Sequence, residues 1–247
     1  MGGLFRGKVV LVTGAGSGIG KAAALAYAAK GATVVVSDRV VSDTAYLIKS
    51  KKGEACFIKA DISIADDCKY LVKEIVERYG KLDIAVNCAG MQGEANNLMD
   101  MSAEGFNKII SDNLCGIFYS MKYEIRAMLK QGVGIIINTA FILGIEKLVS
   151  FSGYDAARHG VIGLTQNAAR EYANENIRIH CVAPEYVNSP ILETIDVKSK
   201  TALSLQHLRG QTGKAEEIAA MVIWLSSDKA SSATSSCYPT GSGYLLN

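Results

Sequence analysis

The sequence predicts one α/β domain built on a doubly wound parallel sheet of about seven strands, with helices on both faces. Short runs rich in β-branched residues alternate with helical runs along the whole chain. The strand runs, such as Lys8–Thr13 and Gly134–Thr139, are continuously apolar, which is typical of strands buried on both faces of a parallel sheet. No linker or repeat divides the 247 residues, so we expect a single domain over 1–247.

The elements follow from the same patterns in chain order. The expected strands are Lys8–Thr13, Thr33–Ser37, Ala55–Ala60, Ile84–Asn87, Gly134–Thr139, Arg178–Ala183 and Ser236–Thr240. Glycine directly follows several helical runs and favours their termination there. The expected helices are Gly18–Lys30, Asp43–Lys52, Asp66–Tyr79, Asn113–Lys130, Tyr154–Ala173 and Lys214–Ser226. The segment 188–213 fits neither period, and we interpret it as a surface excursion in the position of a substrate lid.

The composition excludes several classes of function. With 26 basic and 24 acidic residues, the formal charge of +2 offers no basic surface for nucleic acid. No run approaches the roughly 18 apolar residues of a membrane span, and no signal peptide is recognisable, so we expect a cytoplasmic protein. The 6 cysteines are dispersed and only 3 histidines are present, which predicts reduced thiols and no metal site.

A glycine-rich turn joins the first strand to the first helix. A helix N-terminus presents unpaired N–H groups and a positive dipole, and residues without side chains let a phosphate approach them. The spacing is TGxxxGxG, which differs from GxGxxG, and the strand–turn–helix context predicts a dinucleotide site. The residues proposed to bind the cofactor here are Gly14, Ser17, Gly18, Ile19 and Gly20.

An acidic residue ends the second strand about 20 residues after the glycines. A carboxylate at this place accepts hydrogen bonds from a ribose diol and repels a 2′-phosphate, so Asp38 favours NAD over NADP. The neighbouring Arg39 leaves room for NADP.

Taken together, the motifs resemble those of the short-chain dehydrogenase/reductase family over essentially the full length. Thr13–Gly20 is similar to the family's TGxxxGIG turn, and Asn87-Cys88-Ala89-Gly90 is similar to its NNAG motif. The resemblance implies a Rossmann fold and NAD as cofactor. It adds these cofactor-binding residues: Asp61, Ile62, Asn87, Ala89, Gly90, Pro184, Val187 and Ser189.

The resemblance also implies the catalytic residues, with departures from the family pattern. Tyr154 matches the general acid/base and Asn113 matches the residue that anchors a proton-relay water. Arg158 occupies the slot of the family Lys, and Phe141 occupies the slot of the family Ser. An arginine keeps the charge but does not pass on a proton. A phenylalanine removes a hydrogen-bond donor to the substrate oxygen, a loss that typically costs about 10²–10³ in rate.

Three functions remain open from the sequence. The first is hydride transfer between NAD(H) and a small alcohol or ketone, with weakened activity. The second is a non-catalytic NAD-binding protein. The third is altered chemistry in a pocket rebuilt around Phe141, Glu185 and His180, where Glu185 replaces the Gly of the family's PG motif. The resemblance further implies a homo-oligomer, most simply a tetramer, paired through Asn113–Lys130 and Tyr154–Ala173.

Overall fold

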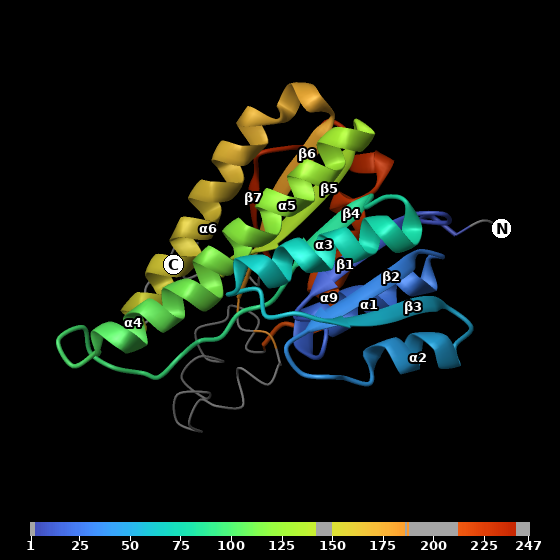
Figure 1. Cartoon of the computed structure of the whole chain (residues 1–247). Coiled ribbons are helices and arrows are strands. Elements are labelled where there is room, and N and C mark those ends of the chain that lie inside the picture. Colours follow the sequence, from blue (N-terminus) through green and yellow to red (C-terminus); the bar gives the residue numbers. More distant parts are fainter. Residues whose placement is uncertain (1–2, 142–149, 186, 188–211, 241–247) are drawn as a thin grey trace.

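Seven parallel strands form the centre of the computed structural model, which describes residues 3–141, 150–185, 187 and 212–240 (Figure 1). Their order across the sheet is β3-β2-β1-β4-β5-β6-β7, and every pair of neighbours is parallel. The strands are β1 (Val9–Thr13), β2 (Thr33–Asp38), β3 (Glu54–Lys59), β4 (Ile84–Asn87), β5 (Gly134–Thr139), β6 (Ile177–Pro184) and β7 (Cys237–Thr240). The doubly wound α/β fold predicted from the sequence is confirmed.

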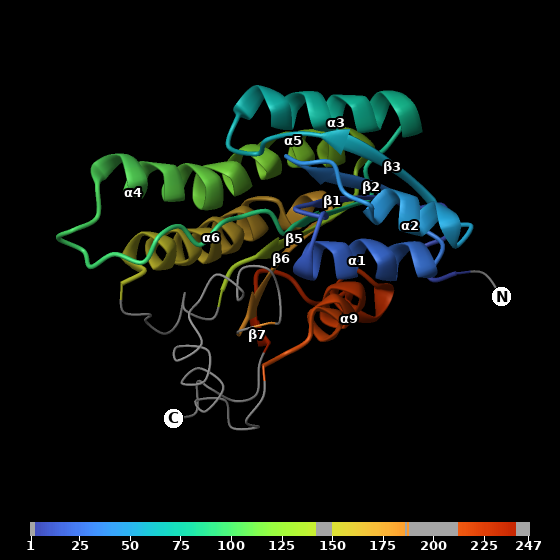
Figure 2. The same cartoon turned by 90° about the horizontal axis from the view of Figure 1, so that it is seen from below.

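Helices cover both faces of this sheet, as the view in Figure 2 shows. On one face lie α3, α5 and α6, and on the other lie α1 and α9, which pack against each other. The helices are α1 (Gly18–Ala29), α2 (Thr44–Ser50), α3 (Ala65–Tyr79), α4 (Ala103–Ile110), α5 (Gly116–Gln131), α6 (Ser152–Glu171) and α9 (Ala215–Leu225). Short helical turns occur at Ser111–Cys115 (η1), Ala173–Glu175 (η3) and Asp228–Ala230 (η4).

Each face of the sheet has its own hydrophobic core. Strand β1 is buried along its whole length, and its side chains alternate between the two cores. Leu11 packs with α3, α5 and α6, whereas Val10 and Val12 pack with α1 and α9. This two-sided burial explains why the strand sequence is continuously apolar.

The helical segment before α5 starts earlier than the sequence predicted. We expected a helix from Asn113, whereas α4 already begins at Ala103 and the π-helical turn η1 joins it to α5. The hydroxyl of Ser102 caps α4 by accepting a hydrogen bond from the backbone N–H of Gly105 at 3.0 Å. Asn113 therefore lies inside a continuous helical rod and does not begin a helix.

The connection from β3 to β4 crosses the sheet and changes the direction in which strands are added. The chain runs outward from β1 to β3, then returns to place β4 on the other side of β1. The connections that leave the carboxyl ends of β1 and β4 therefore run in opposite directions across the sheet. Such a topological switch point is where open α/β sheets bind ligands. Among the described helices, none is long and apolar enough to cross a bilayer.

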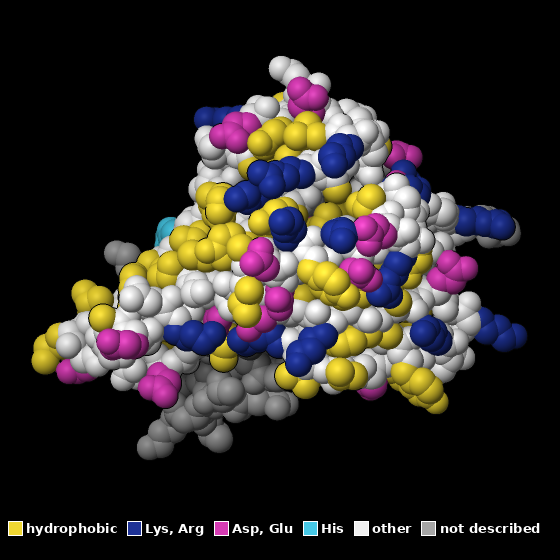
Figure 3. Space-filling model, in the orientation of Figure 1, with side chains coloured by type: hydrophobic (Ala, Val, Ile, Leu, Met, Phe, Trp, Pro, Cys, Tyr) yellow, Lys and Arg dark blue, Asp and Glu magenta, His cyan; other side chains and the backbone are white. Residues whose placement is uncertain are grey.

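The face formed by α3, α4 and α5 carries mixed side chains (Figure 3). Basic and acidic side chains are interspersed with hydrophobic ones on this face, and hydrophobic side chains gather over α4 and α5. Phe106 on α4 and Phe118 on α5 are exposed.

Candidate active site

A cavity of about 240 Å³ lies at the carboxyl ends of the strands, around the switch point. It collects residues from the glycine-rich turn and from the ends of β2, β3, β4, β5 and β6. Most residues predicted from the sequence line this single cavity. They are Gly14, Ser17, Gly18, Ile19, Gly20, Asp38, Asp61, Ile62, Ala89, Gly90, Tyr154, Arg158, Pro184 and Val187. Of the remaining three, Asn87 and Asn113 lie behind the wall, and Ser189 lies outside the described residues, as does most of the segment 188–213.

The glycine-rich turn leaves the N-terminus of α1 open to the cavity. Ser17 is the N-cap residue in extended conformation, and its side chain makes no capping hydrogen bond. No acidic residue stands in the first turn of α1. Gly14 has φ of +63°, and a Cβ there would lie 2.6 Å from the backbone of Ala89, so only glycine allows the turn to approach β4 so closely. Free N–H groups with a positive dipole fit a pyrophosphate.

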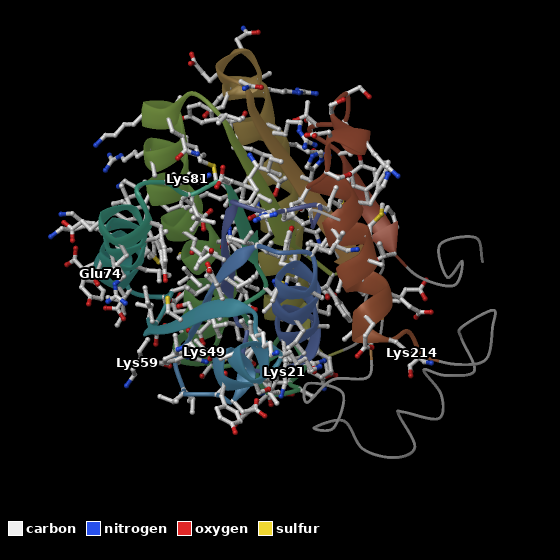
Figure 4. The ribbon with its side chains drawn as sticks, turned by 90° about the vertical axis from the view of Figure 1, so that its right-hand side faces the viewer. Lys21, Lys49, Lys59, Glu74, Lys81 and Lys214 are labelled. Atoms are coloured by element: carbon white, nitrogen blue, oxygen red, sulfur yellow. The ribbon has the colours of Figure 1, made fainter. Side chains whose placement is uncertain are left out.

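Asp38 is held against the glycine-rich turn. Its Oδ2 accepts a hydrogen bond from the backbone N–H of Gly16 at 3.0 Å, and its Oδ1 accepts one from the backbone N–H of Arg39 at 2.7 Å. The carboxylate is thereby fixed at the edge of the cavity. On the outer side, Lys21 of α1, labelled in Figure 4, forms an ion pair with Asp43 at 2.7 Å, which ties α1 to the start of α2.

The guanidinium of Arg39 turns away from Asp38 toward two other acids. Its Nη1 lies 3.8 Å from Oδ2 of Asp61 and 3.8 Å from Oδ2 of Asp112. Asp112 also accepts a hydrogen bond from Lys108 at 2.6 Å. These contacts connect the end of β3 to η1 across one end of the cavity. Sequence reasoning missed Asp112, since nothing in its local pattern marks it.

Asn87 supports the cavity wall from behind and does not line the cavity. Its Nδ2 donates to Oε2 of Glu124 at 3.0 Å and to Oδ1 of Asn138 at 3.0 Å, and its Oδ1 accepts from the hydroxyl of Thr13 at 3.4 Å. These hydrogen bonds hold the ends of β1, β4 and β5 together, and the contact of Asn87 with the cofactor stays a prediction.

Glu124 is a functional candidate that the sequence analysis missed. It is fully buried on α5, where burial raises the pKa of its carboxyl to about 7. A signal was available, because Glu124 interrupts an apolar stripe of Ile117, Met121 and Met128 at helical spacing. A carboxyl on such a stripe must be buried with a partner, and here the partner is Asn87.

The amide of Asn113 is saturated by the backbone. Its Oδ1 accepts from the N–H of Met91 at 3.0 Å, while its Nδ2 donates to the carbonyls of Met91 at 2.8 Å and Ile109 at 2.9 Å. The side chain thus pins the loop after β4 to the π-helical turn. The role of Asn113 in anchoring a proton-relay water stays a prediction.

Tyr154, Arg158 and Phe141 pack together at the opposite end of the cavity from Asp61. The centre of the Arg158 guanidinium lies 5.0 Å from the centroid of the Tyr154 ring. The Phe141 ring meets the Tyr154 ring edge-on at 5.7 Å between centroids. Nη1 of Arg158 donates to the carbonyl of Thr139 at 2.8 Å. Both Tyr154 and Arg158 are 3% exposed.

Within the ranges that the structure describes, no ion pair joins Arg158 to a carboxylate. The ion pairs found among the described residues do not include it, and its buried Nε has no hydrogen-bond partner there. Its guanidinium lines the cavity beside the ring of Tyr154.

Glu185 and His180 differ in their position. Glu185 is 3% exposed and lines the cavity after β6, where its backbone N–H donates to the carbonyl of Thr240 at 3.0 Å. His180 does not line the cavity. It is buried between Arg178 and Tyr238, and burial lowers its pKa to about 4. Of the three residues in the hypothesis of a rebuilt pocket, Phe141 and Glu185 line the cavity and His180 does not.

No group of three or more metal-ligating side chains occurs in the part of the chain that the structure describes. The cavity combines the open N-terminus of α1, the carboxylates of Asp38 and Asp61, and the buried guanidinium of Arg158. These features fit the phosphates and the ribose hydroxyls of a dinucleotide.

Comparisons with known proteins agree with this geometry. A family model described as enoyl-(acyl carrier protein) reductase matches residues 14–244. A cyclohexanol dehydrogenase from Acinetobacter sp. (strain SE19) is 42% identical, over 97% of this chain and 96% of its own. A 3-oxoacyl-[acyl-carrier-protein] reductase from Thermotoga maritima is 36% identical, over 97% of this chain and 98% of its own.

Solved structures superpose on nearly the whole chain. The crystal structure of levodione reductase gives a TM-score of 0.92 at 34% identity, covering 97% of this chain and 98% of that one. A short-chain type dehydrogenase/reductase from Mycobacterium marinum gives a TM-score of 0.92 at 32% identity, covering 98% and 97%. Sequence, motifs and fold thus agree, and the chain belongs to the short-chain dehydrogenase/reductase family of oxidoreductases.

Proposed function

We propose that this protein is an NAD(H)-dependent oxidoreductase that interconverts a small alcohol and the corresponding ketone. One observation carries the proposal. Tyr154 and Arg158 lie in the same cavity as the open N-terminus of α1 and Asp38. A proton-transferring side chain thereby shares a site with groups that fit a dinucleotide.

The preference for NAD over NADP is argued from Asp38 and Arg39. Asp38 is held at the edge of the cavity by the N–H of Gly16, so its negative charge would repel a 2′-phosphate. Arg39 is the nearest cation in sequence, and its guanidinium is engaged by Asp61 and Asp112. To bind a 2′-phosphate, Arg39 would have to leave both acids.

The chemistry assigned to the chain is proton transfer and orientation. A nicotinamide bound in this cavity would supply the hydride acceptor for the alcohol carbon or the hydride donor for the ketone. The phenol oxygen of Tyr154 takes or supplies the proton at the substrate oxygen. The buried charge of Arg158, stacked over the Tyr154 ring, stabilises the negative charge that develops on this oxygen.

Phe141 makes the site more apolar and weaker in catalysis than the family pattern implies. Its ring stands beside Tyr154, where the family has a hydroxyl, so one hydrogen bond to the substrate oxygen is missing. Several relatives carry names of enzymes acting on cyclic alcohols or ketones, among them the cyclohexanol dehydrogenase and levodione reductase. We therefore propose a small apolar ring alcohol or ketone as the substrate class.

The protein is further proposed to be a homotetramer. The resemblance to the family implies pairing through the two long helices. Ile117, Met121 and Ile125 on α5 are buried in the chain's own core. Phe118 remains 43% exposed on the same helix and offers the surface for a partner. The cytoplasmic location stays a prediction.

A titration followed by a turnover screen tests this function. Calorimetry with NADH and NADPH should give tighter binding of NADH. A panel of cyclic and open-chain alcohols and ketones is then assayed by the absorbance of the reduced nicotinamide. Tighter binding of NADPH would overturn the role of Asp38. Turnover that is lost in Tyr154→Phe while NADH binding persists would support the role of Tyr154.

The alternative is a non-catalytic NAD-binding protein, and the packing of Phe141 against Tyr154 favours it. In that case NADH binds as proposed, while the native chain shows no turnover on the panel and Tyr154→Phe changes nothing. The NADH titration followed by the turnover screen therefore distinguishes the two candidate functions.

A further inference from the structure

Two cysteines from distant parts of the chain lie opposite each other on the last two strands of the sheet. Cys181 of β6 pairs in register with Cys237 of β7. Both side chains point to the same face, since Cys181 belongs to the core under α3, α5 and α6 and Cys237 packs against that core. Neighbouring strands lie about 4.8 Å apart, within the range of about 4.4–6.8 Å between Cα atoms that disulfides span.

The two thiols affect each other's ionisation. Their interaction raises the pKa of Cys181 and lowers the pKa of Cys237, while the Cys181 thiol donates to the carbonyl of Val182 at 3.7 Å. Cys181 is fully buried, whereas Cys237 is partly exposed. The residue that a small oxidant reaches first is thus also the one whose thiolate is favoured.

The location permits the movement that a bond would need. Among the described strands, β7 is an edge strand with β6 as its single neighbour, and it is only four residues long. A short edge strand can shift toward its partner at lower cost than a central strand. The other thiols are placed differently, with Cys68 near Ser120 and Cys88 near Thr139.

We propose that Cys181 and Cys237 form an oxidisable dithiol, a modification site that hydrogen peroxide converts into an intramolecular disulfide. The thiolate of Cys237 attacks peroxide, the O–O bond breaks, and Cys237 becomes a sulfenic acid while the leaving hydroxide is protonated to water. The sulfur of Cys181 then attacks Cys237, the S–S bond forms, the S–O bond breaks, and a second water leaves with the proton of Cys181. Two thiols are oxidised and one peroxide is reduced.

This bond would lie close to the proposed active site. Three residues after Cys181, Pro184 pairs with Thr240 and lines the cavity, and the N–H of Glu185 donates to Thr240. A shift of β7 toward β6 would therefore act on the wall of the cavity at Pro184 and Glu185. The dithiol itself does not depend on the proposed function, because its formation is measured without any nucleotide.

Peptide mapping of the full chain tests the proposal. The reduced protein is treated with hydrogen peroxide, alkylated under denaturing conditions and digested. We expect the loss of two alkylatable thiols and a cross-linked peptide joining Cys181 to Cys237, which dithiothreitol releases. The Cys68→Ser variant is the matched control and should form the same cross-link.

Single variants separate the two steps. Cys181→Ser should stop at a sulfenic acid on Cys237, detected as a dimedone adduct, and Cys237→Ser should give neither the adduct nor the cross-link. If the Cys181→Ser chain fails to fold because its site is buried, the Cys237→Ser chain still tests the proposal, since Cys237 is partly exposed on an edge strand. A cross-link to any other cysteine, or unchanged thiols at both positions after oxidation, would overturn the proposal.

Discussion

The carboxyl of Glu124 on α5 accepts a hydrogen bond from Nδ2 of Asn87 at the end of β4, at 3.0 Å, in the interior of the molecule. Asn87 in turn contacts Thr13, the residue at the start of the glycine-rich turn. A titratable group is thereby linked through one amide to the strand that leads into the proposed nucleotide site.

This pair makes stability dependent on pH. Burial raises the pKa of Glu124 from its usual 4.5 to about 7 in the folded chain. Between these two values the folded state binds more protons than the unfolded state, so the free energy of unfolding falls as pH rises. The loss amounts to about 3 kcal/mol once pH exceeds the folded pKa.

The variant Glu124→Gln removes this titration. The free energy of unfolding of the native chain minus that of Glu124→Gln, measured by urea unfolding between pH 5 and pH 8, should fall as pH rises. The opposite contribution of the buried His180, whose pKa is about 4, is common to both chains and leaves this difference unchanged. The exposed control Glu77→Gln on α3 should keep the native slope. An unchanged slope in Glu124→Gln would show that another group causes the pH dependence.

Replacing the two departures in the active site should raise turnover. Phe141→Ser restores a hydrogen-bond donor and clears volume, so it should contribute more than Arg158→Lys, which only changes the form of an existing cation. The gains should not add simply, because Ser, Tyr154 and Lys act as one unit. Rates on the substrate panel measure the effect.

Phe106→Ser is the control for this series, since Phe106 lies on α4 and does not line the cavity. If the native chain already turns over at ordinary family rates, Phe141 is not an obstruction. If the double variant binds NADH but remains inert, the non-catalytic alternative is the better account.

The variant Asp38→Asn tests the choice of cofactor. The amide keeps an oxygen that can accept from Gly16 but loses the negative charge. The ratio of NADPH to NADH dissociation constants should fall at least about tenfold, equivalent to about 1.4 kcal/mol. Asp43→Asn removes an exposed carboxylate nearby and should leave the ratio unchanged.

Gly90 should not tolerate alanine. A Cβ there would lie 2.2 Å from Nη2 of Arg158 and 2.6 Å from Oδ1 of Asn113. Both side chains would have to move, and we expect NADH affinity to fall and stability to drop by about 1–3 kcal/mol. Gly163→Ala on α6 meets nothing within 4 Å, so it should be neutral or stabilise the helix by up to about 1 kcal/mol. Equal melting temperatures for the two variants would contradict this.

Light scattering tests the oligomeric state. A tetramer should give a mass near four times the 26.3 kDa of one chain. The variant Phe118→Lys places a charge on the exposed face of α5 and should shift the mass toward smaller species. A native chain that runs as a monomer at micromolar concentration would disprove the assembly.

The fold was predictable because its signals are local and repeated. The continuously apolar strands and the glycine-rich turn are read directly from the chain, and the turn lies where it was expected. The roles of Asn87 and Asn113 were not predictable in the same way. Their partners, Glu124 for Asn87 and the backbone of Met91 for Asn113, lie far away in sequence, and no spacing rule connects them.

Substitutions in the site were visible in the sequence, but their geometry was not. The sequence placed Arg158 and Phe141 beside Tyr154. It did not show that the guanidinium stacks on the phenol ring while donating to the carbonyl of Thr139. That arrangement depends on packing between α6 and β5, which the sequence pattern of either element alone does not contain.

The switch point between β1 and β4 has a consequence for how the molecule opens. Strands β1, β2 and β3 supply the glycine-rich turn, Asp38 and Asp61, while the other half supplies Gly90, Tyr154 and Arg158. A dinucleotide bound across the switch point would contact both halves of the sheet, which otherwise meet at the β1–β4 ladder. Its binding energy would oppose separation of the two halves. Binding of the dinucleotide would therefore make the two halves unfold together and not one after the other.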